Sequence, residues 1–285
     1  MRMSKRVPKW ATGLLIASVA SGAAGGASLR SLAQADQDFA ASAIENGARY
    51  AYLFYLAPDA VGFEPAPVAL HERWLERLPQ KMVLTMSAKR AGINGAGDFG
   101  WTAGPWLQES RVTGTKAFGD FVTLWKYLPG DGWRIALQAG TTHEAPREDL
   151  PPLRVSRLSK HEGHPDAGDP AARAEGIKRC DDDYAAAILG RGLGAAAASF
   201  GARDLVTLVL GSPTAYTLTA ASGLRAPFGT PGEQQRTFTG VGGSADLGYT
   251  YGTIAFAEPG AQYFLRVWQV RRGKCELEVE WLRPR

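Results

Sequence analysis

The sequence predicts an α+β fold in which two copies of one domain follow each other along the chain. Two long segments, 36–61 and 181–206, match without a gap. A second motif occurs in both halves, as GDFGWTAGPW at 97–106 and ADLGYTYGTI at 245–254. In each half a helical pattern comes first and a series of strand patterns follows, which is typical of α+β rather than of alternating folds.

The repeat determines the domain organisation. Segments 36–61 and 181–206 are offset by 145 residues, the two decapeptides by 148, and the pair Trp125/Trp268 by 143. Offsets that change by a few residues are what loop insertions and deletions in a duplicated domain produce. We therefore expect copy one over 36–143 and copy two, more divergent, over 177–285.

Copy one is predicted to begin with a long helix capped by Asp36 or Asp38, since apolar residues recur at helical spacing from Phe39 to Phe54. A second, amphipathic helix is expected between Pro67 and Pro79. Strands are expected after it at 81–91, 98–110, 119–128 and 132–140, with an Asp-Gly turn in LPGDGW.

The first 35 residues are typical of an export signal. A basic start is followed by the uncharged stretch 10–28 and by the small-x-small sequence Ala33–Ala35. We expect cleavage near Ala35 and a periplasmic or secreted protein with no membrane span after removal of the signal. An uncleaved anchor is the alternative, because 10–28 is almost long enough to span a bilayer.

The basic net charge belongs to this signal. The chain carries +4, and the five basic residues within 1–35, where no acid occurs, are lost with the segment, which leaves −1 on the remainder. No stripe of Lys and Arg with interleaved aromatics remains, so we expect no nucleic-acid partner.

Residues 144–176 are rich in proline and charge and are expected to be a linker. His161 and His164 within it are expected to be solvated, so we expect no metal site and no cofactor. Cys180 and Cys275 are the only cysteines, and the sequence leaves open whether they form a disulfide or stay as buried thiols.

The segments YLAPDAVGF, GDFGWTAGPW and FVTLWKYLPGDGWRIALQAGTTH resemble exported SnoaL-like and ketosteroid-isomerase-like domains of the nuclear-transport-factor-2-like superfamily. The resemblance covers copy one and, more loosely, copy two. It implies two tandem cones, each a curved antiparallel sheet wrapped around a long N-terminal helix and enclosing an apolar pocket. It also implies that the two copies pack as an intramolecular pseudo-dimer.

The function expected from these features is binding of a small apolar molecule in the copy-one pocket, with copy two as pseudo-dimer partner. We expect the pocket wall to be formed by aromatic residues and one hydroxyl: Tyr55, Trp101, Thr102, Trp106 and Trp125.

Two other functions remain open at this stage. In the first, Asp98 is the general acid-base of an isomerase, dehydratase or hydrolase, its pKa raised by neighbouring aromatics. The alternative role for Asp98 is structural, accepting backbone N–H groups beside a glycine-rich turn, which fits its presence in both copies as Asp98 and Asp246. In the second function, the protein is a non-catalytic interaction module of the cell envelope.

Overall fold

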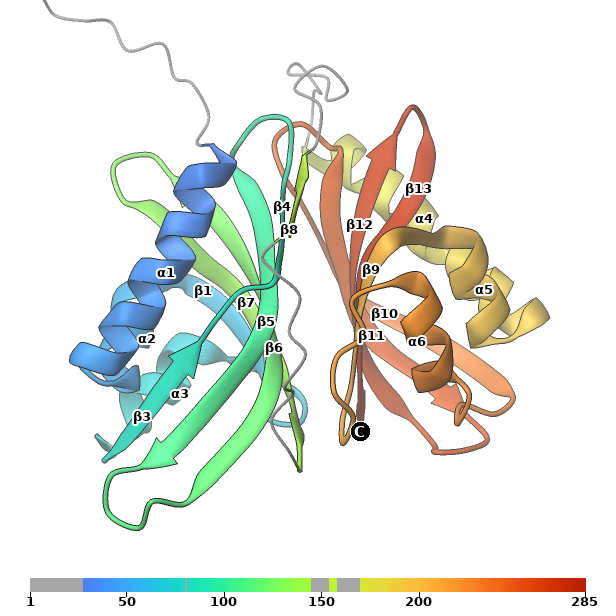
Figure 1. The fold of residues 1–285 in the computed structure, drawn as a ribbon. Coiled ribbons are helices and arrows are strands. Elements are labelled where there is room, and N and C mark those ends of the chain that lie inside the picture. Colours follow the sequence, from blue (N-terminus) through green and yellow to red (C-terminus); the bar gives the residue numbers. More distant parts are fainter. Residues whose placement is uncertain (1–27, 80, 145–153, 158–169) are drawn as a thin grey trace, which may run out of the picture.

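A computed structural model of the chain describes residues 28–79, 81–144, 154–157 and 170–285. Two β-sheets stand face to face at the centre of the molecule, and helices cover the outer face of each (Figure 1). The order of layers is therefore helices, sheet, sheet, helices, and each half of the sequence supplies one sheet with its helices.

Domain one forms an eight-stranded sheet in the order β2-β1-β7-β6-β5-β4-β8, with β3 paired to β5. Its elements are α1 (Leu29–Glu45), α2 (Ala48–Tyr55), β1 (Leu56–Phe63), β2 (Pro67–Ala69), α3 (Leu70–Glu76), β3 (Met82–Met86), β4 (Arg90–Ile93), β5 (Phe99–Ser110), β6 (Lys116–Leu128), β7 (Gly132–His143) and β8 (Arg154–Arg157).

Domain two forms a five-stranded sheet in the order β10-β11-β12-β13-β9. Its elements are α4 (Pro170–Arg191), α5 (Leu193–Phe200), β9 (Gly201–Val209), α6 (Leu218–Arg225), β10 (Pro231–Val241), β11 (Leu247–Phe256), β12 (Gln262–Arg271) and β13 (Lys274–Pro284).

The predicted α+β class is confirmed, but the sheets are mixed rather than purely antiparallel. In each domain the first strand lies beside the last strand and parallel to it, β1 beside β7 and β9 beside β13. A third parallel pair joins β4 to β8. The remaining neighbours are antiparallel, as expected for strands joined by short turns.

The first helix of domain one differs from the prediction at both ends. It begins at Leu29 with Ser28 as its cap, so Asp36 lies inside the helix instead of at its start. It also breaks after Glu45, because Gly47 has a φ of +88°, a conformation that side chains with a Cβ rarely adopt. Gly192 breaks the corresponding helix of domain two with a φ of +82°, which explains why this glycine occurs in both copies.

The expected cleavage site, Ala33–Ala35, lies within α1. Leu32, just before it, is fully buried, and its side chain lies against Gly100 of β5. A cut after Ala35 would therefore remove part of the core of domain one. The folded domain begins upstream of residue 36.

The expected linker is partly structured where it is described. Residues 154–157 form β8 against the edge strand β4, and α4 already begins at Pro170. The linker histidines, His161 and His164, and the start of the chain at 1–27 lie outside the described residues.

The glycines of the repeated decapeptide allow close packing at equivalent places in the two domains. A Cβ on Gly100 would stand 2.6 Å from Leu32 of α1, and one on Gly248 would stand 2.7 Å from Ile177 of α4. These distances are too short for real Cβ contacts, and a Cβ would also stand 2.7 Å from the Gly92 carbonyl or 2.6 Å from the Gly240 carbonyl, so a larger residue would require the structure to shift. The motif therefore serves the fold in both copies.

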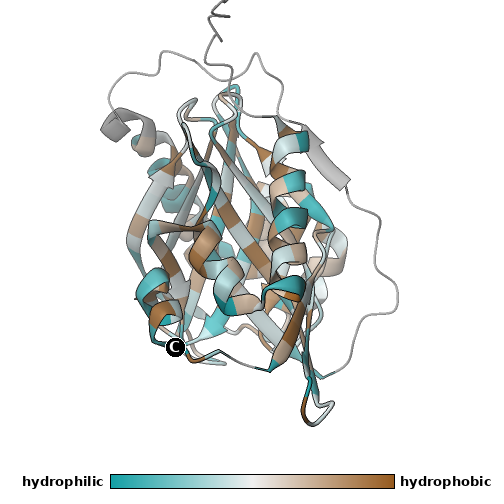
Figure 2. Ribbon diagram, turned by 90° about the vertical axis from the view of Figure 1, so that its left-hand side faces the viewer, coloured by the Kyte–Doolittle hydropathy of each residue, from teal (hydrophilic) through white to brown (hydrophobic). Residues whose placement is uncertain are grey.

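The facing surfaces of the two sheets form a shared apolar core. Trp101 of β5 and Trp281 of β13 are among its fully buried side chains, and Phe63 contacts both Tyr251 and Trp281. Apolar residues, brown in Figure 2, run along the strands of the sheets. A second and a third core lie between each sheet and its own helices.

The two cysteines form a disulfide in domain two. Cys180 of α4 and Cys275 of β13 are joined with a Cα–Cα distance of 5.5 Å, within the usual range for such bonds. The bond resolves the choice that the sequence left open, and it ties the first helix of domain two to its last strand. Within the described residues, no helix is both long and apolar enough to cross a membrane.

Candidate functional site

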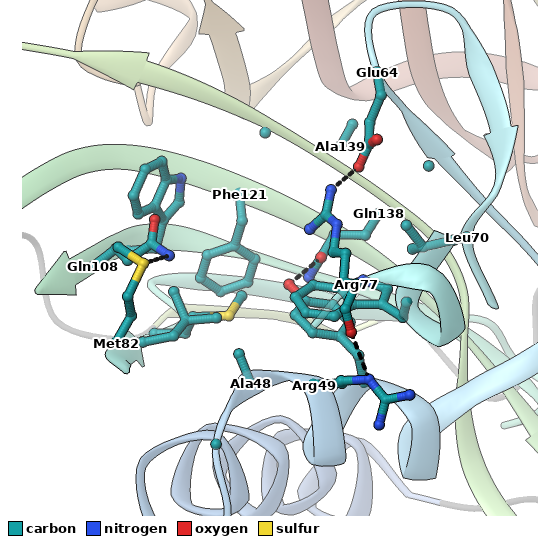
Figure 3. A pocket seen from close by; sticks show the side chains of 18 of the residues that line it. Ala48, Arg49, Glu64, Leu70, Arg77, Met82, Gln108, Phe121, Gln138 and Ala139 are labelled. Carbon is teal, nitrogen blue, oxygen red and sulfur yellow. Dashed lines mark hydrogen bonds and ion pairs between the residues drawn. The ribbon is translucent and has the colours of Figure 1, made fainter. Parts of the chain in front are cut away.

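A cavity of about 320 Å³ lies in domain one between the helices and the outer face of the sheet, which the helices cover (Figure 3). Helices α2 and α3 form one side, while β3, β5, β6 and β7 form the other. This volume is at the lower end of the range for sites that bind small organic molecules.

Strand β3 supplies a continuous apolar wall to the cavity. Met82, Leu84 and Met86 alternate along the strand, so all three side chains point to the same face. Phe121 and Trp106 extend this wall. Methionine has a flexible side chain and a polarisable sulfur, so such a wall can adapt to ligands of different shape.

The middle of the cavity holds a chain of neutral polar groups. The Tyr52 hydroxyl donates to Oε1 of Gln138, and Nε2 of Gln138 donates to Oγ1 of Thr123 at 3.0 Å. The ring of Tyr52 stacks on Trp74 at a centroid distance of 4.0 Å. Burial raises the pKa of Tyr52 well above its ordinary value, so the hydroxyl remains neutral and can act as a donor at neutral pH.

One end of the cavity carries charge. Glu64 pairs with Arg77 and, at 3.0 Å, with Arg73. The guanidinium of Arg77 also stands 4.5 Å from the centroid of the Trp74 ring. Arg49 lines the same end and donates to the backbone carbonyls of Arg77 and Leu75 at 2.7 and 3.1 Å.

The five residues predicted for the pocket are not brought together. Trp106 lines the cavity. Trp101 does not, because it lies on the opposite face of β5, in the core between the two sheets. Tyr55 lines a separate, shallow groove beside Trp133.

Thr102 and Trp125 belong to a buried network that leads away from the cavity. Nε1 of Trp125 donates to Oγ1 of Thr102 at 2.9 Å, and that hydroxyl donates to Oδ1 of Asp36 at 2.7 Å. These contacts fix α1 against β5. The equivalent indole of domain two, Trp268, donates to Thr250 at 3.2 Å, so this part of the network is a shared element of the two folds.

Asp98 lies at the contact between the domains, away from the cavity. The backbone N–H of Gly243 donates to both carboxylate oxygens of Asp98, at 3.0 and 3.1 Å, and Asn94 donates at 2.6 Å. Asp246 makes the reciprocal contact, accepting from the backbone N–H of Gly95 at 2.8 Å. Each aspartate thus binds the turn that precedes the other, and these contacts support a structural role.

Domain two has charged side chains at the positions where domain one has the neutral polar groups of Thr123 and Gln138. The strand pairing places Arg266 opposite Glu280, as it places Thr123 opposite Gln138. Glu280 accepts from Arg225 of α6 at 2.7 Å and from Arg266 at 3.4 Å, and all three side chains are almost completely buried.

Asp181, also buried, completes this network by accepting from Arg266 at 2.9 Å. Burial alone would raise the pKa of Glu280, but the two guanidinium groups lower it below its ordinary value. Domain two therefore has buried ion pairs at the sheet positions where domain one has the neutral pair Thr123 and Gln138, of which Gln138 lines the cavity.

Sequence reasoning missed most of the cavity. Met82, Leu84 and Met86 carry a usable signal, since they alternate in a predicted strand. Tyr52 and Arg77 carry none, because each belongs to an amphipathic segment with several equivalent side chains. Among the described residues, no group of three or more His, Cys, Asp or Glu side chains is placed to hold a metal ion.

No protein-family model matches the chain, and no curated protein sequence does. Similar solved structures include a protein of unknown function with a cystatin-like fold from Nostoc punctiforme, with 14% identity, 42% of this chain and 96% of that chain covered, and a TM-score of 0.33. A second is an NTF-2-like protein of unknown function from Shewanella oneidensis, with 14% identity, 39% of this chain and 96% of that chain covered, and a TM-score of 0.33. A third is a ketosteroid isomerase-like protein from Erwinia carotovora, with 14% identity, 40% of this chain and 95% of that chain covered, and a TM-score of 0.31. These likenesses concern the fold alone.

The reciprocal aspartate contacts predict a loss of stability when either carboxylate is removed. Asp98→Ala and Asp246→Ala should each lower the free energy of unfolding by about 1–3 kcal/mol, because the partly buried backbone N–H groups of Gly243 and Gly95 lose their charged acceptors. Urea unfolding measures this change. The matched control is Asp59→Ala, which removes a largely exposed carboxylate paired with Lys126 and should cost less than about 1 kcal/mol. A cost for Asp98→Ala no larger than that of the control would contradict the structural role.

Asp36 predicts a specific pH dependence of stability. Burial is the main cause that raises its pKa to about 6, against the opposing effect of the Thr102 hydroxyl. The folded state therefore holds this proton more tightly than the unfolded state, so the contribution of Asp36 to stability is greatest below its unfolded pKa and is lost as the pH rises to about 6 and beyond.

Asp36→Asn should remove this dependence. Between about pH 4 and pH 7, the unfolding free energy of the variant should rise relative to that of the unmodified chain by up to about 3 kcal/mol. Urea unfolding at a series of pH values measures the difference. A difference that stays constant with pH would show that Asp36 does not titrate in this range.

Proposed function

We propose that the chain binds a small, largely apolar molecule in the cavity of domain one. The observation that carries this proposal is the contrast between the two copies. Domain two has the buried ion pairs of Arg225, Arg266 and Glu280 on the helical side of its sheet. On the same side of its own sheet, domain one has neutral polar groups, and Met82, Leu84 and Phe121 line an open volume. Apolar surface left uncovered costs stability, so a bound molecule that covers it accounts for its presence.

Domain two acts, in this proposal, as a built-in dimer partner for domain one. The apolar face of each sheet is covered by the other, and the turns are bound together through Asp98 and Asp246. The sheet below the cavity is then held in one shape without a second chain.

An enzymatic role has less support. Asp98 accepts from the backbone N–H of Gly243 and from the Asn94 side chain, outside the cavity. Among the described residues that line the cavity, the carboxylate is Glu64, and two guanidinium groups hold it. A general base needs a free carboxylate within reach of the substrate.

A larger side chain in the cavity wall should weaken the binding of an apolar dye. N-phenyl-1-naphthylamine, a neutral dye that fluoresces in apolar surroundings, should bind the full chain and gain fluorescence. Leu84→Trp places a large indole in the cavity wall and should weaken dye binding by about tenfold or more, because the dye and the indole compete for the same volume. Fluorescence titration measures the affinity.

The matched control is Leu189→Trp, which adds the same indole at an exposed position on α4 of domain two. It should bind the dye as the unmodified chain does. If the unmodified chain gives no saturable fluorescence, or if both variants bind equally well, the cavity is not the binding site. Native mass spectrometry of the chain from its own host would then identify what, if anything, accompanies it.

We also propose that the chain is exported. The basic and then apolar segment at 1–35 and the Cys180–Cys275 disulfide support this, since disulfides persist in oxidising compartments. Because Leu32 is part of the core, cleavage should leave a mature N-terminus at or before Ser28. Terminal sequencing of the chain recovered from the periplasm or the medium tests this, and a mature chain that begins at Asp36 or retains Met1 would contradict it.

A further inference from the structure

We propose that the molecule bound in domain one is amphipathic and carries a carboxylate, which Arg77 binds. This inference rests on the proposed function and specifies the ligand of the same cavity. The charged side chains that line the cavity within the described residues are Arg49, Arg77 and Glu64, so the cationic groups outnumber the anionic one. They gather at one end, whereas Met82, Leu84 and Phe121 form an apolar wall (Figure 3).

Arg77 can bind a ligand carboxylate without leaving a charge unpaired. Its present partner, Glu64, is shared with Arg73, which lies 3.0 Å from Oε2 of that carboxylate. When Arg77 turns to a ligand, Glu64 therefore keeps one guanidinium. An exchange of this kind avoids the large cost of leaving a carboxylate without a counter-charge in partly buried surroundings.

The position of Arg77 is fixed on both sides. Its guanidinium lies against the face of Trp74, and Trp74 in turn stacks on Tyr52 in the middle of the cavity. Its backbone carbonyl accepts from Nε of Arg49 at 2.7 Å. Arginine held in this way presents a planar pair of donors to a carboxylate, so little side-chain freedom is lost on binding.

The neutral polar groups of the cavity are less suited to bind the head group. Tyr52 donates to Gln138, and Gln138 donates to Thr123, so a ligand that took either donor would break an existing hydrogen bond in a buried place. The charged end therefore offers the stronger interaction at the smaller cost. A carboxylate at Arg77 would leave the apolar part of the ligand along β3.

The test compares two ligands that differ only in the head group. Decanoate and 1-decanol are used to displace N-phenyl-1-naphthylamine from the full chain at neutral pH. Decanoate should bind about tenfold more tightly than decanol, since a hydrogen bond to a charged group is worth more than one to a neutral group. The ratio of the two affinities is the quantity measured.

Three variants locate the effect. Arg77→Gln should remove the preference for decanoate while leaving the affinity for decanol, and Arg77→Lys should keep part of the preference because it keeps the charge. Glu64→Gln should strengthen decanoate binding several-fold, because the competing carboxylate is gone. Arg191→Gln, on α4 of domain two, is the matched control and should behave as the unmodified chain.

The outcomes separate this inference from the proposed function. Equal affinities for decanoate and decanol, or a preference that survives in Arg77→Gln, would overturn the carboxylate assignment and leave the cavity as a binding site. Failure of the dye, decanoate and decanol to bind at all would overturn the proposed function itself. If Arg77→Gln does not fold, the Glu64→Gln variant tests the assignment in its place. Unchanged decanoate affinity in Glu64→Gln would show that Glu64 and the ligand do not compete for Arg77, and would overturn the assignment.

Discussion

The packing of one sheet against the other is the constraint on which the rest of the structure depends. It covers the apolar faces of both sheets, so neither domain exposes the surface that holds Trp101 and Trp281. The aspartates at 98 and 246 fix the relative position of the sheets, because each binds a backbone N–H of the other domain's turn. With these faces occupied, the helical side of each sheet is the place left for a ligand.

Side chains on the helical side of the sheet are charged in domain two where they are neutral in domain one, and a few residue differences account for this contrast. At equivalent positions in the strand pairing, Thr123 and Gln138 are replaced by Arg266 and Glu280. The buried guanidinium and carboxylate require further partners, which Arg225 and Asp181 supply. Removing any one member would leave the buried charges of this network unbalanced, so its members depend on one another.

The sequence predicted the features that depend on local pattern and repetition. The repeat and the order of helices and strands within each copy follow from spacing, and the structure adds that the equivalent glycines at 100 and 248 pack against equivalent helices. The helix cap was misplaced because Ser28 stands in a segment that reads as an export signal. The sequence favours Asp36 as a cap because nothing in it indicates that Thr102 lies beside this carboxylate.

The resemblance predicted a pocket in copy one, but most of the residues that line it could not be predicted, because no single element carries them. The walls of the cavity come from α2, α3 and strands far apart in the sequence. Asp98, which the sequence favours as the catalytic candidate, is bound at the contact between the domains instead. Composition also placed Trp101 with Trp106, although alternation along β5 puts them on opposite faces. Because the domain is duplicated, the same region of the fold can be compared between domain one and domain two. Arg225, Arg266 and Glu280 show that the same side of this sheet can carry a buried charged network, whereas domain one has neutral side chains around an open volume.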